Sequence, residues 1–398
     1  MKPWKSTRLN GLRVSWSLAV GLALLVRPGL CPASAWPDPK VMELVVAGTD
    51  RLLNLDYDEA DQSFSRLGER DATGLLAPFY QAYVTLARIE NREATRDEID
   101  AFLASVGGIT TRAEEQLTRD PDDPDLQLFL GMAWGSKAMI DGVRGNYLSA
   151  YEGIKRTKRY LDACLQHQPI RHDAYFGLGL YDYTLSRVSW FFRPLVQMVL
   201  PPGDRERGLR ELVLASERGT ATKTLAKFAL LQTYTGLEKD YGRALPLAEE
   251  LLRRFPGNPE LYFLAALVYS EQGQFTEALE IGRRIQANLD QERHHFRREM
   301  LPRYLQLMGK VYMDRGEYPT ALSFFRKAIE QPTTRYTWVT AWAWTRTGMI
   351  QDLLGDRGEA TKSYRMALAV ETDGIAKDAA RQYLNEPYRK ETALRSAP

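Results

Sequence analysis

Four histidines are the residues of this chain whose types and spacing come nearest to metal or acid–base chemistry. His167 and His172 lie five positions apart across a proline, so they do not share one helix face, although Asp173 offers an oxygen ligand beside them. His294 and His295 are adjacent, and adjacent residues on a helix diverge by about 100°. We therefore expect no metal site at either pair, and a solvated basic face around the second pair.

Other chemical motifs are equally incomplete. Gly177 and Gly179 suggest a dinucleotide-binding turn, but the third glycine and the preceding strand are missing. Asp122 and Asp123 lie between two prolines, which is typical of a loop rather than of a general-acid pair. Cys164 has helical neighbours and no base nearby in the sequence, so we expect a buried, unreactive thiol. The sequence predicts no enzyme and no cofactor.

One pattern of small and aromatic residues recurs in the last third of the chain. In the first half, a large residue is followed four positions later by a small one, and then by an aromatic residue and a glycine. The second half reads Ala-x3-aromatic-x2-Ala. The clearest copy begins at Leu305, has Gly309 and Gly316 in its first half, and continues with Ala321 and Phe325. Related copies occupy 259–285 and 344–367. The spacing indicates two helices that cross closely at small residues.

The pattern resembles the tetratricopeptide repeat (TPR), in which two helices form a hairpin and hairpins stack. Gly309 and Gly348 occupy the position where the helices cross, and Gly273, Gly316 and Gly355 stand where a left-handed residue ends the first helix. The resemblance implies an all-α fold, a right-handed superhelical solenoid of TPR-like helix hairpins. No alternating pattern predicts a sheet.

The repeat pattern weakens toward the N-terminus. Ala244 precedes Ala278 by 34 residues, which is the TPR period, and fainter copies begin near Gly48. We expect degenerate repeats over residues 36–224, clear repeats over 225–370, and a capping helix and tail over 371–398. The capping helix would place Ile375, Ala379, Tyr383 and Leu384 on one side.

The first 35 residues are typical of a signal peptide. Four basic residues precede an apolar run of 13 residues from Val14 to Val26, and Ala33-Ser34-Ala35 follows as a cleavage site. The run is short for a bilayer span, which favours cleavage after Ala35 over an uncleaved anchor. The protein is expected to be periplasmic or secreted.

The charge balance argues against nucleic-acid binding. The chain carries a net charge of +2, and loss of the five basic residues in the leader leaves −3. Nucleic-acid binding normally requires a basic excess, so we expect no nucleic-acid partner.

The segment 188–203 is the most apolar part beyond the leader, and it exceeds the short turn that a TPR hairpin needs. It is interpreted as an inserted helix packed on the solenoid, as a loop of unknown purpose, or as a lip that touches a membrane or partner through Trp190, Phe191 and Phe192.

The resemblance also implies binding positions, because the first helices of a TPR array line its concave groove. In the order of the repeats these positions are Phe263, Leu267 and Ser270, then Arg303, Gln306, Lys310 and Met313, then Trp342, Thr345, Met349 and Asp352. The Lys and Asn that grip terminal carboxylates in one TPR subgroup are absent from them. Trp338 and Trp342 are further candidates for exposure, whereas Trp344 belongs to the repeat core.

Two functions are open at this point. The first is a non-enzymatic exported scaffold that binds a protein or peptide partner in the cell envelope through its concave groove. The second is a lipid- or glycan-associated accessory protein that uses the 188–203 segment at a membrane. A hydrolase has no catalytic constellation to support it.

Overall fold

The computed structural model describes residues 39–71, 73–91, 95–187, 201–331, 333, 335–372 and 374–389. These residues form helices joined by turns, and no strand occurs among them. The all-helical prediction is confirmed. The predicted signal peptide and the residues 188–200 lie outside the described ranges.

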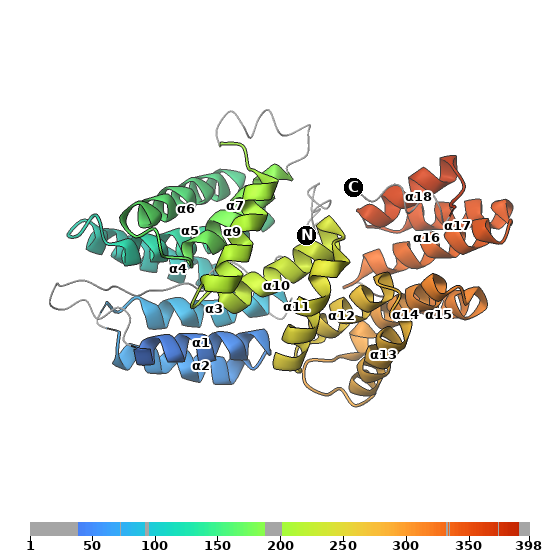
Figure 1. The fold of residues 1–398 in the computed structure, drawn as a ribbon, viewed down its shortest axis with the longest axis horizontal. Coiled ribbons are helices and arrows are strands. Elements are labelled where there is room, and N and C mark those ends of the chain that lie inside the picture. Colours follow the sequence, from blue (N-terminus) through green and yellow to red (C-terminus); the bar gives the residue numbers. More distant parts are fainter. Residues whose placement is uncertain are drawn as a thin grey trace. The chain divides into compact units, whose positions relative to one another are not determined.

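The helices divide into two compact units, with the boundary between Leu230 and Leu231. The boundary predicted from the sequence at 224/225 marks where the repeat pattern becomes clear. It does not describe a division between compact units, so it stays a prediction. The N-terminal unit contains α1 (Pro39–Leu53), α2 (Tyr57–Ser65), α3 (Leu76–Glu90), α4 (Arg96–Leu117), α5 (Pro124–Val143), α6 (Tyr147–His167), α7 (Ala174–Ser186), α9 (Arg205–Arg218) and most of α10 (Lys223–Thr233) (Figure 1).

The C-terminal unit continues from α10 through a π-helical turn at Tyr234–Glu238. Its helices are α11 (Tyr241–Arg254), α12 (Pro259–Glu271), α13 (Phe275–Asp290), α14 (Leu301–Arg315), α15 (Tyr318–Glu330), α16 (Thr337–Leu353), α17 (Arg357–Ala369) and α18 (Ile375–Asn385).

Within each unit, consecutive helices pair as hairpins and each hairpin packs on the next. The pairs are α1/α2, α3/α4, α5/α6 and α7/α9 in the first unit, and α12/α13, α14/α15 and α16/α17 in the second (Figure 1). First helices also contact one another directly, as α12 does α14, and α14 does α16. This is the stacking of a helical solenoid, because a lone hairpin could not bury its apolar side.

The small residues lie where the sequence predicts them. A Cβ added to Gly309 would stand 2.5 Å from Phe325 Cε1, and one added to Gly348 would stand 2.6 Å from Tyr364 Cε1. Gly316 ends α14 with φ of 90°, a left-handed conformation that glycine adopts without strain.

The last helix, α18, packs against α16 and α17 and closes the stack. Its buried residues are Ala376 and Ala380, and Ile375 is 59% exposed. The predicted apolar side is correct for Tyr383 and Leu384, which pack against the core of the last hairpin, and wrong for Ile375. Ala376 is buried instead, and Thr345 on α16 donates a hydrogen bond to its carbonyl oxygen, at 3.1 Å.

Candidate partner-binding surface

The residues predicted to line a groove all lie on α12, α14 and α16, whose shared surface we call the first-helix face. At one end of this face, both guanidinium nitrogens of Arg303 donate to the Glu260 carboxylate, at 2.6 and 2.9 Å. The Arg303 guanidinium also lies 4.1 Å from the centroid of the Phe263 ring. Although burial lowers the pKa of Arg303, its pair with Glu260 raises that pKa overall. Arg303 therefore stays charged and ties α14 to α12.

A second polar group joins the same helices near their other ends. Lys310 Nζ lies 2.9 Å from Glu271 Oε1 and 2.5 Å from Asp314 Oδ2. Ser270 donates to the same Asp314 oxygen at 2.7 Å. Repeat positions that the resemblance assigns to partner contact thus hold neighbouring first helices together.

Burial separates the nine predicted contact residues into two groups. Five are buried, namely Phe263, Gln306, Lys310, Met313 and Thr345, and four are half-buried, namely Leu267, Arg303, Trp342 and Met349. The outward exposure expected of the first group is not observed, because adjacent first helices pack closely enough to cover these side chains. Their contact with a partner stays a prediction.

Two of these positions face the C-terminal cap. Thr345 donates to carbonyl oxygens of both Ala341 and Ala376, and Met349 packs against the cluster that includes Tyr364 and Ala380. α18 occupies the side of α16 that a following repeat would cover.

One line of partly exposed residues follows α16, and we call it the tryptophan–arginine stripe: Trp338, Trp342 and Arg346. They are four positions apart, so they follow one side of the helix. Trp338 is 37% exposed, whereas Trp344 packs against the core as predicted. Tryptophan and arginine are the residue types that most often dominate binding energy at protein interfaces.

Arg346 is the member of the stripe that the sequence reasoning missed. Its guanidinium lies 4.5 Å from the Trp342 ring centroid. Among the described residues it makes no hydrogen bond or ion pair, although the charges of Asp314 and Glu271 act on it. Burial lowers its pKa, and these two carboxylates oppose that shift. In the TPR pattern, Arg346 does not occupy a position that faces the groove. Only its spacing of four residues from Trp342 could have indicated from the sequence that the two side chains lie together.

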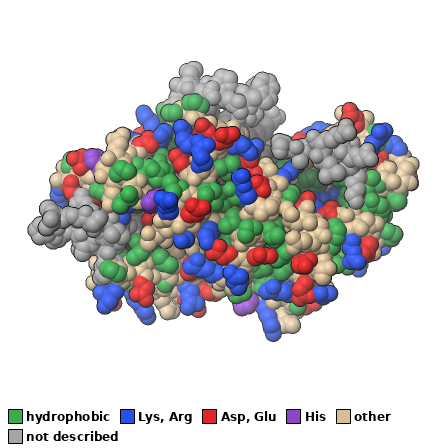
Figure 2. Space-filling view, in the orientation of Figure 1, with side chains coloured by type: hydrophobic (Ala, Val, Ile, Leu, Met, Phe, Trp, Pro, Cys, Tyr) green, Lys and Arg blue, Asp and Glu red, His purple; other side chains and the backbone are tan. Residues whose placement is uncertain are grey.

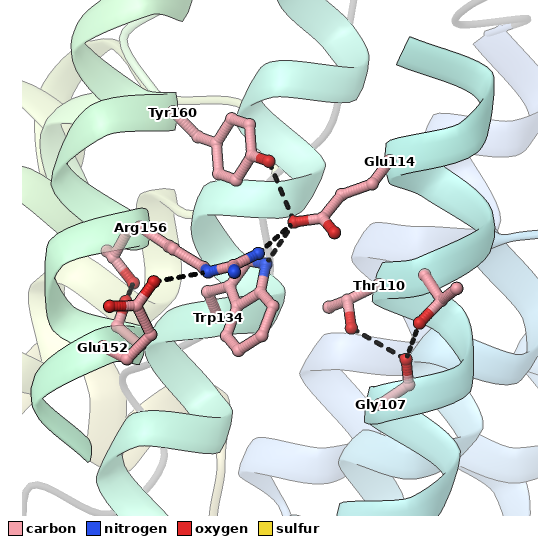
Figure 3. Close-up of polar contacts among 10 residues, drawn as sticks. Gly107, Thr110, Glu114, Trp134, Glu152, Arg156 and Tyr160 are labelled. Carbon is pink, nitrogen blue, oxygen red and sulfur yellow. Dashed lines mark hydrogen bonds and ion pairs between the residues drawn. The ribbon is translucent and has the colours of Figure 1, made fainter. Parts of the chain in front are cut away.

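The N-terminal unit contains a different polar cluster, shown in Figure 3. Glu114 Oε1 on α4 accepts hydrogen bonds from Trp134 Nε1 at 3.2 Å, Arg156 at 2.8 Å and the Tyr160 hydroxyl at 2.9 Å. Arg156 also donates to Glu152 and lies 4.5 Å over the Trp134 ring. Because these groups satisfy one another, the cluster acts as a clamp between α4, α5 and α6 rather than as a reactive site.

The residues considered for chemistry are dispersed. Burial raises the pKa of the Cys164 thiol to about 12, which leaves it protonated at neutral pH. His167 Nε2 lies 3.5 Å from Asp122 Oδ1, and the His172 ring is paired with Tyr175. Across the described ranges, no group of three or more metal-ligating side chains comes together.

The predicted lip residues Trp190, Phe191 and Phe192 lie outside the described residues. No helix within the described part of the chain is both long enough and apolar enough to cross a bilayer. The exposed apolar side chains in the N-terminal unit include Val143, Tyr147 and Leu148, which gather at the α5–α6 turn.

Comparisons with solved structures find all-helical repeat proteins of low similarity. Human IFIT1, solved as a dimer with m7Gppp-AAAA, shows 15% identity and a TM-score of 0.41, with 90% of this chain and 87% of that chain covered. Cut9 in the APC/C hetero-tetramer Cut9–Hcn1 shows 14% identity and 0.41, covering 86% and 62%. Yeast Tom70 shows 13% identity and 0.37, covering 91% and 84%. Scores of this size transfer no ligand or partner to this chain.

In sequence, no curated protein matches the chain. The tetratricopeptide repeat family matches residues 237–296, which span α11, α12 and α13. The matched region begins the series of hairpins with crossing glycines and left-handed caps described above. The family match identifies residues 237–296 as a tetratricopeptide repeat region, and the hairpins that follow it have the crossing glycines of the same repeat pattern.

Proposed function

We propose that this protein is a non-enzymatic, exported scaffold that binds a protein or peptide partner in the cell envelope through its first-helix face. The observation that carries the proposal is the tryptophan–arginine stripe. Trp338 is 37% exposed, Trp342 is half-buried, and Arg346 lies over the Trp342 ring without a hydrogen bond or ion pair among the described residues. A partner that brings an acceptor to Arg346 would gain a charge-assisted hydrogen bond there.

A protein partner fits this face better than a nucleic acid. The other cations of the face are balanced by acids, since Arg303 pairs with Glu260 and Lys310 with Glu271. Lys, Arg, Asp and Glu side chains are also interspersed over the surface seen in Figure 2. Phosphate binding requires an excess of unpaired cations, which this face does not offer.

The test is recovery of the partner from the native envelope. The tagged full-length chain would be crosslinked in its own cells and compared with Trp342→Ala and Arg346→Gln. We expect a protein recovered in near-equal amount with the unchanged chain, and a loss of at least tenfold with either variant. Met366→Ala is the matched control, because Met366 is 48% exposed on α17, away from the stripe. Equal recovery with all variants would remove the stripe as the binding surface.

Export rests on the leader pattern in residues 1–35. N-terminal sequencing of the protein from cells should begin at Trp36. A mature chain that still begins at Met1 would contradict cleavage.

A second function, contact with a membrane surface, is favoured by the exposed trio Val143, Tyr147 and Leu148. Flotation with liposomes should then fall with Leu148→Ser and with the Trp190→Ser/Phe191→Ser pair. Ile170→Ser is the control, because Ile170 is 65% exposed at the α6–α7 turn. Absence of flotation at every lipid composition would end this alternative.

A further inference from the structure

The C-terminal end of the described chain returns to the first-helix face after α18. Asp352 on α16 is the anchor, with a side chain that is only 1% exposed. Its carboxylate accepts hydrogen bonds from Arg357 at 3.1 Å, from the Tyr364 hydroxyl at 2.8 Å and from the backbone N–H of Tyr388 at 2.8 Å. One buried carboxylate therefore holds both the last hairpin and the segment beyond the last helix.

We call Glu386–Pro387–Tyr388 the Tyr388 segment. Pro387 favours an extended backbone here, because it limits both its own φ and the conformation of Glu386. Tyr388 is 9% exposed, and its ring meets the Tyr383 ring edge-on at 5.1 Å. Arg357 also donates to the Leu384 carbonyl oxygen at 2.7 Å, where α18 ends.

The segment lies near the residues that the proposed function uses. Burial raises the pKa of Tyr388 to about 12, Asp314 on α14 adds to this shift, and Arg346 of the stripe opposes it. The hydrogen bond from the Tyr388 N–H to Asp352 fixes the segment on α16, at a position that the repeat pattern assigns to the groove. An extended stretch of this chain thus already occupies the surface where we place a partner.

The contacts of the Tyr388 segment are separable from those that hold the unit together. Without it, Asp352 keeps its hydrogen bonds to Arg357 and Tyr364. Ala376 and Ala380 of α18 remain buried against the preceding hairpin. The segment contributes one backbone hydrogen bond and one ring, which a competing segment of the same form could replace.

We propose that the first-helix face recognises an extended Pro–Tyr segment, and that the Tyr388 segment is the occupant supplied by the chain itself, which a partner must displace. This rests on the proposed function, since it names the partner's form and its regulation. Only molecules whose face is free can bind the partner. The partner's apparent Kd is therefore its intrinsic Kd divided by the fraction of molecules whose face is free. Local concentration favours the internal segment, so a partner gains access only by making further contacts, such as those with the stripe.

The experiment uses a peptide of this chain's own sequence as the probe. A fluorescein-labelled peptide covering residues 384–392 would be titrated into full-length wild-type protein and into full-length Tyr388→Ala, with anisotropy as the readout. We expect the peptide to bind Tyr388→Ala at least tenfold more tightly than wild type. The same peptide with alanine in place of its tyrosine should bind neither protein.

Pro387→Gly provides a second variant, because it loosens the segment while keeping the Tyr388 ring. We expect its peptide affinity to lie between those of wild type and Tyr388→Ala. Circular dichroism would show that the variants are folded. Equal peptide affinity for wild type and both folded variants, or no binding to either variant, would overturn the proposal. The crosslinking result with Trp342→Ala is read separately, so loss of this proposal would leave the scaffold function standing.

Discussion

The two units place the polar contacts described above between different helices, although both are stacks of helix hairpins. In the N-terminal unit, single carboxylates collect several donors from neighbouring helices, as Glu114 does from α5 and α6. In the C-terminal unit, ion pairs join successive first helices, as Arg303–Glu260 and Lys310–Glu271 do between α14 and α12. The first arrangement clamps a hairpin to the helix before it, whereas the second places paired charges beside the tryptophan–arginine stripe.

The crossing points differ as well. Gly309 and Gly348 in the C-terminal unit are closed by aromatic side chains, Phe325 and Tyr364. In the N-terminal unit, α7 and α9 meet backbone to backbone, since a Cβ on Gly179 would stand 2.9 Å from the Gly208 carbonyl oxygen. A side chain can rotate away from an added methyl group, but a helix backbone cannot. The crossings at Gly309 and Gly348 should therefore tolerate substitution better than the α7/α9 crossing.

The largest expected effect tests that difference directly. Gly179→Ala should destabilise the N-terminal unit by about 3 kcal/mol, because two helices must move apart, whereas Gly309→Ala should cost the C-terminal unit about 1–2 kcal/mol. Midpoints of urea unfolding, followed separately for the two units by hydrogen exchange, would measure both. Gly107→Ala is the control, since nothing lies within 4 Å of its added Cβ and the change should be neutral or stabilising. Equal losses at Gly179 and Gly309 would refute the contrast.

A smaller difference should separate the two kinds of polar contact. Glu114→Ala leaves three donors without their acceptor, so we expect a loss of about 2 kcal/mol in the N-terminal unit, reduced by water because the cluster is partly exposed. Glu260→Ala leaves one guanidinium that can still lie on the Phe263 ring, so we expect about 1 kcal/mol in the C-terminal unit. Thermal unfolding would compare them. A larger loss of stability from Glu260→Ala than from Glu114→Ala would contradict the assignment of Glu114 as a clamp.

The smallest expected effect is a pH dependence confined to the N-terminal unit. Burial raises the pKa of Glu211 on α9 to about 7, and the Asp182 carboxylate on α7 adds to the shift. Arg207, Lys158 and Asp162 also act on Glu211, the first two lowering its pKa and the third raising it. Because the folded pKa exceeds the unfolded value, the folded state holds the proton between about pH 4.5 and 7.

Stability of this unit should consequently fall as the pH rises from 4.5 to 7 and then level off. Screening reduces the effect to about 1–2 kcal/mol, since Glu211 is only partly buried. Glu211→Gln should flatten the profile. A midpoint of unfolding that is the same at pH 5 and pH 8 in both proteins would exclude the effect.

Much of the fold was predictable because a TPR hairpin is specified by contacts between residues close in sequence. Gly309 and Phe325 are 16 positions apart, and Gly316 ends α14 by its own backbone conformation. The packing of Trp344 against the core and the burial of Cys164 follow from helical spacing for the same reason. These features require no knowledge of how one hairpin sits on the next.

The candidate surface depended on the relation between hairpins, and there the sequence determined residue types but not their exposure. Gln306, Lys310 and Thr345 occupy positions that face outward in the repeat pattern, yet each is buried by a neighbouring first helix or by α18. Arg346 and Tyr388 became relevant only because the tertiary structure brings α16 and the end of the chain together. A repeat pattern records which side of a helix a residue takes, while the distance to the next helix decides whether solvent, a partner or the chain itself covers that side.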